Sequence, residues 1–254
     1  MMNKPTGYVC QFARNTKRQA IINFKTLSRD RRLTRWIVTA AFPLVLGFLP
    51  STLSAATYYV STSGSDANQG SQDSPLRHVS EGAARAVAGD TVIVMDGTYD
   101  NEGKRDPSYV VDLTHSGTAS QPITFKAQHR GAAILDGGLT SSTSCNGAYA
   151  YFNLASESYI VIQGFQIRNT CEEGIHNNDS AHHITIRNNE IHHIANLPAT
   201  DNYGRDAMYC GPDVHDIILD GNSVHDIGRS NTSFTDSLDH GFYAKCSNVT
   251  ITNK

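Results

Sequence analysis

Residues 158–167, SYIVIQGFQI, and residues 182–191, HHITIRNNEI, share one apolar pattern: two apolar residues two positions apart, and a third five positions later. Its first part recurs as Ile160-x-Ile162, Ile184-x-Ile186, Ile217-x-Leu219 and Val249-x-Ile251, and the last two intervals between copies are nearly equal. Each copy alternates like a β-strand but is too short to bury its own apolar face, so the copies must stack. Coils of a parallel β-helix stack strands about 4.8 Å apart around one core. The repeat therefore predicts an all-β parallel β-helix.

The segment 1–55 has the composition of an export signal. Nine basic residues there face a single acidic one, and an uncharged apolar run begins at Trp36. The run is short for a membrane span, contains prolines, and is followed by small residues that suit a signal peptidase. We therefore expect a signal peptide over 1–55, one β-helix domain over 56–254, and a secreted or periplasmic protein with no membrane anchor after cleavage.

The chain beyond residue 55 is strongly acidic. It keeps 12 of the 21 Lys and Arg residues but 23 of the 24 Asp and Glu residues, so its net charge is near −11, against −3 for the whole chain. Such a surface repels nucleic acid and anionic membranes, and neither is expected as a partner. An anionic substrate would need a local basic patch or a bound cation.

Four cysteines follow the export segment: Cys145, Cys171, Cys210 and Cys246. An even number in an exported chain permits two disulfides, with three possible connectivities. Cys210 and Cys246 fall on neighbouring coils in the register described below, which favours that pair. No CxxC or Cys/His zinc spacing is present, so a structural zinc site of that kind is not expected.

A short helix is expected before the main repeat. Ser80 can N-cap a helix that runs through 81–87 and ends at Gly89. A helix at this point suits a cap over the open apolar end of the stack. Since the chain stops at Lys254 with no second cap in view, we expect a β-helix that is C-terminally incomplete; a full-length chain is expected to be a monomer. Strands are expected at 57–61, 91–95, 109–113, 123–127 and 133–135.

A series of short motifs precedes the repeat. They are Tyr58-Tyr59-Val60-Ser61, Gly64-Ser65-Asp66-x-Asn68-x-Gly70, Ser74-Pro75, Ala88-Gly89-Asp90-Thr91-Val92, Asp96-Gly97-Thr98-Tyr99, Ser116-Gly117-Thr118, Pro122-Ile123-Thr124, Gly131 and Ile134-x-Asp136-Gly137. Together they resemble the N-terminal half of secreted right-handed parallel β-helix proteins of the pectate-lyase type, especially the family-nine polysaccharide lyases. The motifs belong to the scaffold, so the resemblance implies the fold and a lyase-like protein but leaves the substrate open.

Aligning the coils gives three strands per turn and predicts which side chains face outward. The first strands stack 174–177, 207–210 and 241–244, with Ile175, Met208 and Phe242 inward and His176, Tyr209 and Tyr243 outward as one ladder. A shared turn position, expected to adopt left-handed backbone geometry, holds Gly164, Asn188, Gly221 and Asn253.

The histidines of the repeat follow the same offset. His215 follows His182, and His225 follows His192, at the interval that separates Ile184 from Ile217. One interpretation is a metal cluster formed by His182, His183, His192 and His193. Recurrence with the coil favours ring stacking along the scaffold instead.

Two neighbouring coils carry longer loops than the coil before them. These loops, about 195–206 and 228–240, are expected to wall a groove beside the outward ladder. Their charged residues are Asp201, Arg205, Asp206, Arg229, Asp236, Asp239 and His240, with Lys245 just beyond. Glu172 and Glu173 would adjoin Arg205 and Asp206 on the next coil. We expect His176, Tyr209 and Arg229 to bind a charged sugar chain, since cations pair with uronate carboxylates and aromatic rings pack on pyranoses.

The resemblance also implies a chemistry. β-Elimination needs the substrate carboxylate neutralised, a base for the C5 proton and a proton donor for the leaving oxygen. In the resembled lyases a calcium ion held by acidic residues neutralises the substrate carboxylate, and a Lys or Arg removes the C5 proton. Placed on this register, the expected Ca²⁺ ligands are Asp206, Asp236 and Asp239. The expected base is Lys245 or Arg205, with its pKa lowered by burial or a like charge. The proton donor is Tyr243 or His240.

The leading expectation is therefore a calcium-assisted lyase acting on an acidic, uronate-containing polysaccharide. An inverting glycoside hydrolase would use paired carboxylates about 6.5–9.5 Å apart, and Asp236, Asp239 and His240 could serve that chemistry. A uronate epimerase would share the proton abstraction. A non-catalytic glycan-binding β-helix is the remaining alternative.

Overall fold

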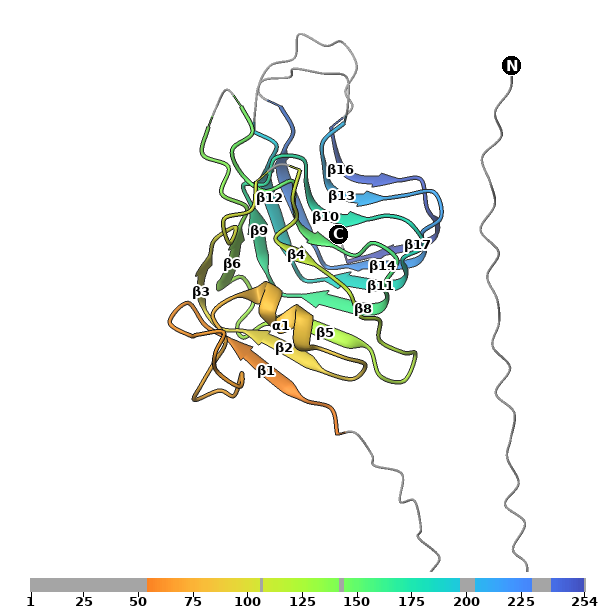
Figure 1. The fold of residues 1–254 in the computed structure, drawn as a ribbon. Coiled ribbons are helices and arrows are strands. Elements are labelled where there is room, and N and C mark those ends of the chain that lie inside the picture. Colours follow the sequence, from red (N-terminus) through yellow and green to blue (C-terminus); the bar gives the residue numbers. More distant parts are fainter. Residues whose placement is uncertain (1–53, 106, 142–143, 197–203, 230–238, 254) are drawn as a thin grey trace, which may run out of the picture. The chain divides into compact units, whose positions relative to one another are not determined.

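The computed structural model describes residues 54–105, 107–141, 144–196, 204–229 and 239–253, which lie in the compact unit Ser51–Lys254 (Figure 1). Its strands form one seven-stranded and two five-stranded sheets. The seven-stranded sheet is β1 (Thr57–Val60), β2 (Thr91–Val94), β5 (Ile123–Ala127), β8 (Ser158–Gln163), β11 (His182–Arg187), β14 (His215–Asp220) and β17 (Ser247–Thr252). The second sheet is β16 (His240–Ala244), β13 (Asp206–Cys210), β10 (Glu173–Asn177), β7 (Ala150–Asn153) and β4 (Val111–Asp112). The third is β15 (Ser223–Ile227), β12 (Glu190–Ile194), β9 (Gln166–Arg168), β6 (Ala133–Asp136) and β3 (Gly97–Tyr99).

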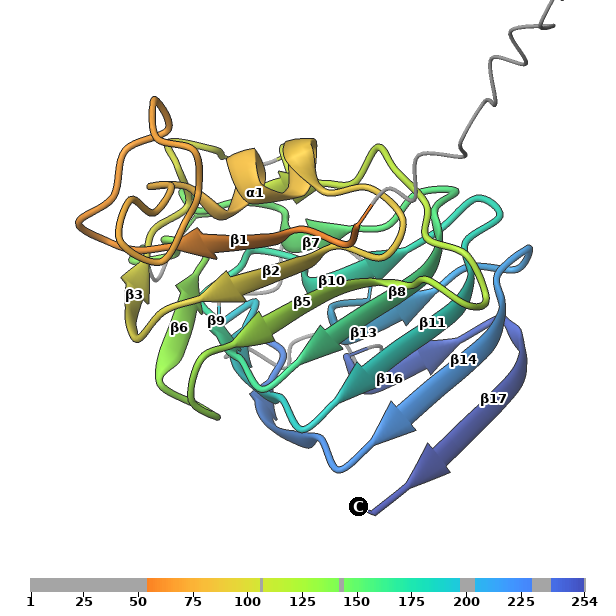
Figure 2. The ribbon, with the colours of Figure 1, turned by 90° about the horizontal axis from the view of Figure 1, so that it is seen from below.

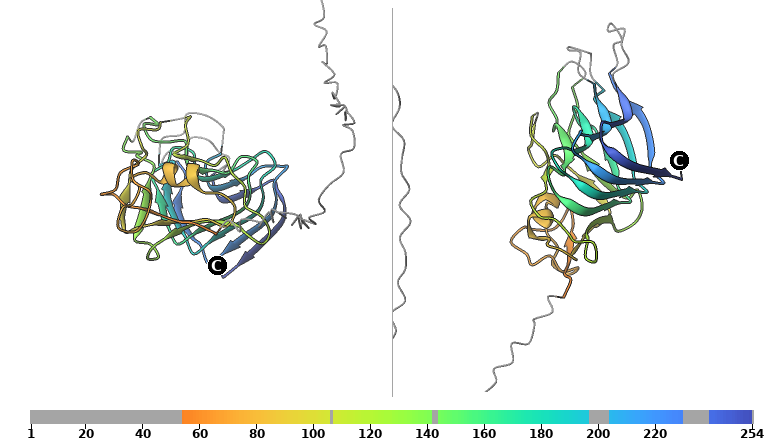
Figure 3. Two further views of the ribbon diagram at one scale, coloured as in Figure 1. Left: turned by 60° about the horizontal axis from the view of Figure 1, so that its bottom comes forward. Right: turned by 90° about the vertical axis from the view of Figure 1, so that its right-hand side faces the viewer.

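Each turn of the chain visits the three sheets in the same order. The first turn is β2, β3 and β4, and the fifth is β14, β15 and β16, after which β17 returns to the long sheet. The pairing along the long sheet, for example β8 with β11 and β11 with β14, is parallel. Figures 2 and 3 show the strands stacked as successive rungs. The prediction of an all-β parallel β-helix is confirmed, as a solenoid of about five turns with one short helix among the described residues.

The apolar repeat forms the core. Ile160, Ile184 and Ile217 are Cα partners across β8, β11 and β14, and all three are fully buried. Inside the coils, the ring of Phe152 lies 5.8 Å from that of Phe125 and 6.2 Å from that of Phe165, measured between centroids. Apolar side chains from all three sheets therefore share one interior, because no single strand could bury its own apolar face.

The predicted turn position is confirmed. Gly164, Asn188, Gly221 and Asn253 all have positive φ, between 48° and 80°. The amides that stabilise the turns, however, come one residue later. The buried Asn189 accepts from the Phe165 backbone N–H at 2.9 Å, and Asn222 accepts from the Asn189 N–H at 3.0 Å. Stacked Asn side chains thus satisfy backbone groups that the turns leave unpaired.

The helix α1 (Val79–Arg85) begins and ends two residues earlier than the predicted run 81–87, and its N-cap prediction is wrong. The residue before the helix, His78, makes no side-chain capping bond. Instead the Glu102 carboxylate accepts from the Ser80 backbone N–H at 3.3 Å and also bonds the Ser80 hydroxyl. An acidic group at a helix N-terminus supplies the missing acceptor, here from a distant turn. The helix contacts β1, β2 and β4; its role as a cap stays a prediction.

Two disulfides join the four cysteines of this unit. Cys210 pairs with Cys246, as the register favoured, and Cys145 pairs with Cys171. The bridge from Cys210 links the end of β13 to the residue following Lys245, so it ties two neighbouring coils together. Among the described residues no helix is long and apolar enough to cross a membrane. The predicted signal peptide lies almost entirely outside the described residues and stays a prediction.

Candidate functional site

The outward ladder predicted from the register exists on the sheet β16-β13-β10-β7-β4. His176 is the Cα partner of Tyr209, and Tyr209 is the partner of Tyr243. The same row continues to Asn153 on β7. Ile175 belongs to the apolar core and His176 does not, although both are buried and His176 is only 8 % exposed. These residues define one row of the candidate site.

Neighbouring rings of this row lie against one another, stacked for His176 and Tyr209 and tilted for Tyr209 and Tyr243. The rings of His176 and Tyr209 lie 5.2 Å apart at 10°, and those of Tyr209 and Tyr243 lie 6.1 Å apart at 32°. Tyr109 and Tyr149, which no sequence pattern marks as part of a site, flank His176 with ring centroids at 5.4 and 5.9 Å. The His176 ring is buried, and its face is covered by the ring of Tyr209, so this end of the row offers little ring surface to solvent.

A second row, of acids and a histidine, runs beside the first. Glu173, Asp206 and His240 are Cα partners on β10, β13 and β16. The expected adjacency of Glu173 and Asp206 is thus confirmed. Glu173 bonds His176 Nδ1 on its own strand, and His240 Nδ1 lies 3.0 Å from Asp206 Oδ1. The site therefore contains two carboxylate–imidazole pairs on neighbouring coils.

Both carboxylates in this row are buried, with Glu173 6 % and Asp206 3 % exposed. Burial is the main cause that raises the pKa of Glu173, and the nearby Asp206 charge raises it further, against the bond from His176. Burial likewise raises the pKa of Asp206, against the bond from His240. Two buried acids side by side are costly unless a cation or a proton compensates them. This cost marks the pair as a candidate functional site.

Two arginines border the acids. Arg205 is buried, and its Nη1 lies 2.7 Å from Glu172 Oε2. Arg229 holds Asp239 with two contacts, Nη2 to Oδ1 at 2.9 Å and Nε to Oδ2 at 3.1 Å. Asp239 also accepts the backbone N–H groups of Arg205 and Arg229. Burial acts to raise the pKa of Asp239, but the bonds and charge of Arg229 outweigh it and leave that pKa lowered.

The remaining predicted residues fall into two groups. Tyr243, His240 and Lys245 lie together: the rings of His240 and Tyr243 stack at 4.9 Å, and Lys245 Nζ is 5.2 Å from the Tyr243 ring centroid. Lys245 is exposed. Asp236 and Asp201 lie outside the described residues, as do most of the two long loops expected to wall the groove. The Arg205 N–H to Asp239 bond nevertheless places the ends of both loops on the same side of the coil stack.

The donor set of the second row fits the calcium ion that the family resemblance implies. Calcium prefers carboxylate and other hard oxygen ligands. Glu173 faces His176 through Oε2 and Asp206 faces His240 through Oδ1, so the second oxygen of each acid lies outside these two imidazole bonds. Asp239, in contrast, is already neutralised by Arg229. Glu173 and Asp206 are therefore the residues best suited to hold a hard cation.

Glu173→Gln is expected to remove a pH-dependent loss of stability. The pKa of Glu173 is raised above its ordinary value of 4.5, so its contribution to stability is fully present below pH 4.5 and is lost as the pH rises through the folded-state pKa. In calcium-free buffer, the wild type should lose stability relative to the variant in a window that opens near pH 4.5. Urea midpoints measured across that window provide the check.

The matched control is Glu190→Gln. Hydrogen bonds from Gln166 and His225 lower the pKa of Glu190. Its contribution is present above the ordinary carboxyl pKa and is lost as the pH falls through the folded-state value, which is the opposite sign. A Glu173→Gln variant that follows the wild-type pH dependence would contradict the assignment of a penalty to this acid.

Comparisons with known proteins agree with this fold. The family model described as "Pel9A-like, right handed beta helix region" matches residues 58–251. Pectate lyase PEL9 of Emericella nidulans is 36% identical over 102 residues, which cover 40% of this chain and 22% of that protein. The uncharacterized protein YwoF of Bacillus subtilis is 30% identical over 176 residues, which cover 60% of this chain and 35% of that protein.

Among solved structures, the GH136 lacto-N-biosidase of Eubacterium ramulus superposes with a TM-score of 0.51 at 18% identity, covering 78% of this chain and 40% of that one. This likeness concerns the fold alone. The chain spans between 22% and 35% of the length of the two curated relatives. Because the family model matches nearly the whole described solenoid, the chain belongs to the Pel9A-like β-helix family.

Proposed function

We propose that this protein cleaves an acidic, uronate-containing polysaccharide by calcium-assisted β-elimination on the outer face of the sheet β16-β13-β10-β7-β4. The observation that carries the proposal is the pair of buried acids, Glu173 and Asp206, each bonded to a histidine and aligned on neighbouring coils. The similarity to a protein named pectate lyase supports the same reaction class.

Glu173, Asp206 and Arg205 would together bind the carboxylate of a uronate residue in the substrate. Calcium held by Glu173 and Asp206 would neutralise the uronate carboxylate and make the C5 proton more acidic. Arg205 immediately precedes Asp206, with its guanidinium on Glu172, and would orient the sugar acid by charge and hydrogen bonds. Tyr209, between His176 and Tyr243, would contact the chain through its hydroxyl.

His240 is suited to take the C5 proton. In the neutral ring whose Nδ1 donates to Asp206 Oδ1, 3.0 Å away, Nε2 carries no proton and would act as the base. The Tyr243 ring stacks on that imidazole and carries a hydroxyl that would donate to the leaving oxygen. Lys245, whose Nζ lies over the Tyr243 ring, is the competing base. Asp206 thereby orients the base through one oxygen and binds the cation through the other.

One assay tests the proposed function. The protein is incubated with polygalacturonate or alginate, with calcium or with a chelator. We expect the ultraviolet absorbance of an unsaturated product in the presence of calcium and its loss with chelator. New reducing ends without that absorbance would indicate hydrolysis, exchange of the C5 hydrogen with heavy water without cleavage would indicate an epimerase, and binding alone would indicate a glycan-binding module. Each of these three results would overturn the proposal.

A further inference from the structure

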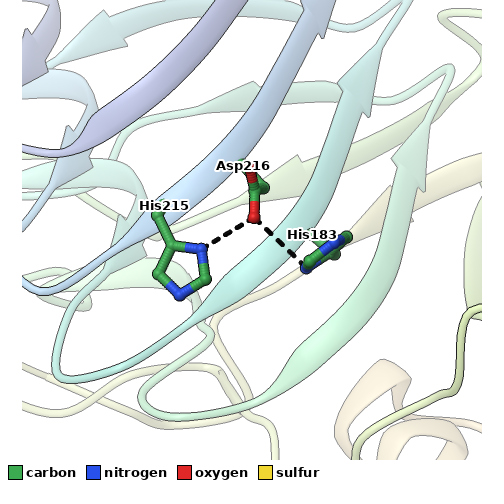
Figure 4. A group of neighbouring side chains, drawn as sticks. All are labelled: His183, His215 and Asp216. Atoms are coloured by element: carbon green, nitrogen blue, oxygen red, sulfur yellow. Dashed lines mark hydrogen bonds and ion pairs between the residues drawn. The ribbon is translucent and has the colours of Figure 1, made fainter.

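A second cluster of metal-binding side chains lies on a different sheet from the proposed lyase site. It is formed by His183, His215 and Asp216 at the beginnings of β11 and β14, on the outside of the seven-stranded sheet (Figure 4). The two strands are paired, with His182 opposite His215. The cluster therefore joins two neighbouring coils.

The backbone explains why so many polar side chains meet here. The second residue of each strand in this part of the sheet has a left-handed conformation, with φ of 56° at Tyr159, 55° at His183, 59° at Asp216 and 53° at Asn248. Such geometry is uncommon outside glycine, and Asn, Asp and His adopt it more readily than most residues. It interrupts the strict alternation, so the first two side chains of each strand both stay outside the core while Ile184 is buried.

The distances between the donor atoms are close to those of a metal site. Asp216 Oδ2 lies 2.8 Å from His215 Nδ1 and 3.6 Å from His183 Nδ1. One donor atom from each of the three residues lies within 4.8 Å of the others. In a tetrahedral zinc site with bonds of about 2.0–2.2 Å, neighbouring ligand atoms are roughly 3.3–3.6 Å apart. Small side-chain rotations would reach that geometry.

Each of the three ligands is oriented by a neighbour. Asn248 Nδ2 donates to Asp216 Oδ1, which leaves Oδ2 directed at the histidines. The Tyr159 ring stacks on His183 at 4.6 Å, and the His182 ring stacks on His215 at 5.0 Å and 2°. Partners that hold ligands in place are the usual surroundings of a metal centre. His183 Nδ1 also lies 2.8 Å from His182 Nδ1, a hydrogen bond that a metal bond would replace.

The chain contains a near copy of this arrangement. His182-His183-Ile184 lies over His215-Asp216-Ile217, and His192-His193-Ile194 lies over His225-Asp226-Ile227. The stacking predicted for both pairs of coils is confirmed, since the rings of His192 and His225 lie 5.1 Å apart at 7°.

The geometry of the copy differs from that of the first cluster. Asp226 Oδ2 is 4.0 Å from His193 Nδ1, and His225 Nε2 is bound by Glu190 Oε1 at 3.1 Å. The copy therefore has the same residue types, but its donor atoms do not come together in the same way. Substitutions in the copy can serve as an internal control.

A shallow groove of about 450 Å³ adjoins the first cluster; Tyr159, His183, Asp216, Ile218 and Asn248 help to line it. We propose that His183, His215 and Asp216 bind one divalent transition-metal ion, with Zn²⁺ as the ion tested, and leave one coordination position open toward this groove. Imidazole nitrogen selects such ions over calcium and magnesium, which prefer oxygen ligands. Three protein ligands with one open position are typical of accessible zinc sites.

The test is a zinc titration of the full chain, freed of metal by a chelator and followed by calorimetry. We expect one zinc site, unaffected by excess Ca²⁺, and loss of that site in His215→Ala and in Asp216→Asn. Asn248→Ala, which removes only the orienting bond, should weaken zinc binding about 10–100-fold. His193→Ala and Asp226→Asn in the neighbouring copy should bind zinc as the wild type does.

A second readout separates metal binding from folding. Cobalt substituted for zinc should give the visible absorption of a four-coordinate site in the wild type and in His193→Ala, and should not do so in His215→Ala, while the far-ultraviolet circular dichroism of all three stays the same. Equal zinc affinity in the wild type and Asp216→Asn would overturn the proposal. Loss of the site in His193→Ala would also overturn it.

Discussion

His240→Ala is expected to lower kcat for β-elimination by about 10²–10⁴-fold, the usual contribution of a positioned proton-transfer group, with a small change in KM. The reason is that His240 combines a hydrogen bond to the buried Asp206 with a ring stacked on Tyr243, so it links the acid row to the proton donor. The measurement is the rate of unsaturated product formed from polygalacturonate in calcium, at saturating substrate.

The matched control is His225→Ala. His225 is also bonded to an aspartate, Asp226, at 2.9 Å, but it lies on β15 in another sheet and should leave kcat unchanged. Lys245→Ala tests whether the base is Lys245 instead of His240. Full activity in His240→Ala, together with loss of elimination in Lys245→Ala, would assign the base to the lysine and remove His240 from the reaction.

Ile186→Ala is expected to lower the free energy of unfolding by about 2–5 kcal/mol, the range for deleting a buried aliphatic side chain. Ile186 is fully buried between Ile162 and Leu219, its Cα partners on the neighbouring coils. Truncation would leave a cavity in the middle of the stack, where the rigid coils above and below limit relaxation. Urea unfolding followed by circular dichroism measures the change.

Ile218→Ala provides the comparison on the same sheet. Ile218 is 45 % exposed on β14, so the same substitution should change the free energy of unfolding by no more than about 0.5 kcal/mol. Equal losses in both variants would contradict the division between core and surface. Solenoid coils can unfold with limited cooperativity. The slope of the free energy of unfolding against urea concentration should therefore be compared between the variants, as well as the midpoint.

Much of the candidate site follows from the repeat, because a stacked solenoid converts sequence offsets into contacts. Once Ile184 is aligned with Ile217, the ladder of His176 and Tyr209 and the neighbours Glu173 and Asp206 follow from alternation and strand pairing. The disulfide between Cys210 and Cys246 follows from the same alignment.

Other parts of the site depend on contacts that no offset encodes. Tyr149 reaches His176 from the residue before a strand that has no clear pattern of its own. The pairing of Asp239 with Arg229 joins residues at the two ends of a long loop, and it gives a cationic partner to a carboxylate that the sequence placed among the expected calcium ligands. Long irregular connections have no periodicity from which such pairings could be inferred.

The sequence by itself determined the solenoid, its register and the residues that share each outward row. It did so because apolar side chains two positions apart must be buried together, and coil length sets which ones meet. Only the tertiary structure decided which charges are compensated: Glu102 reaches the start of α1, and Arg229 neutralises Asp239 while Glu173 and Asp206 stay buried side by side. The electrostatic energies of these charges depend on burial and on side chains that approach from separate loops. The spacing of a sequence repeat predicts neither.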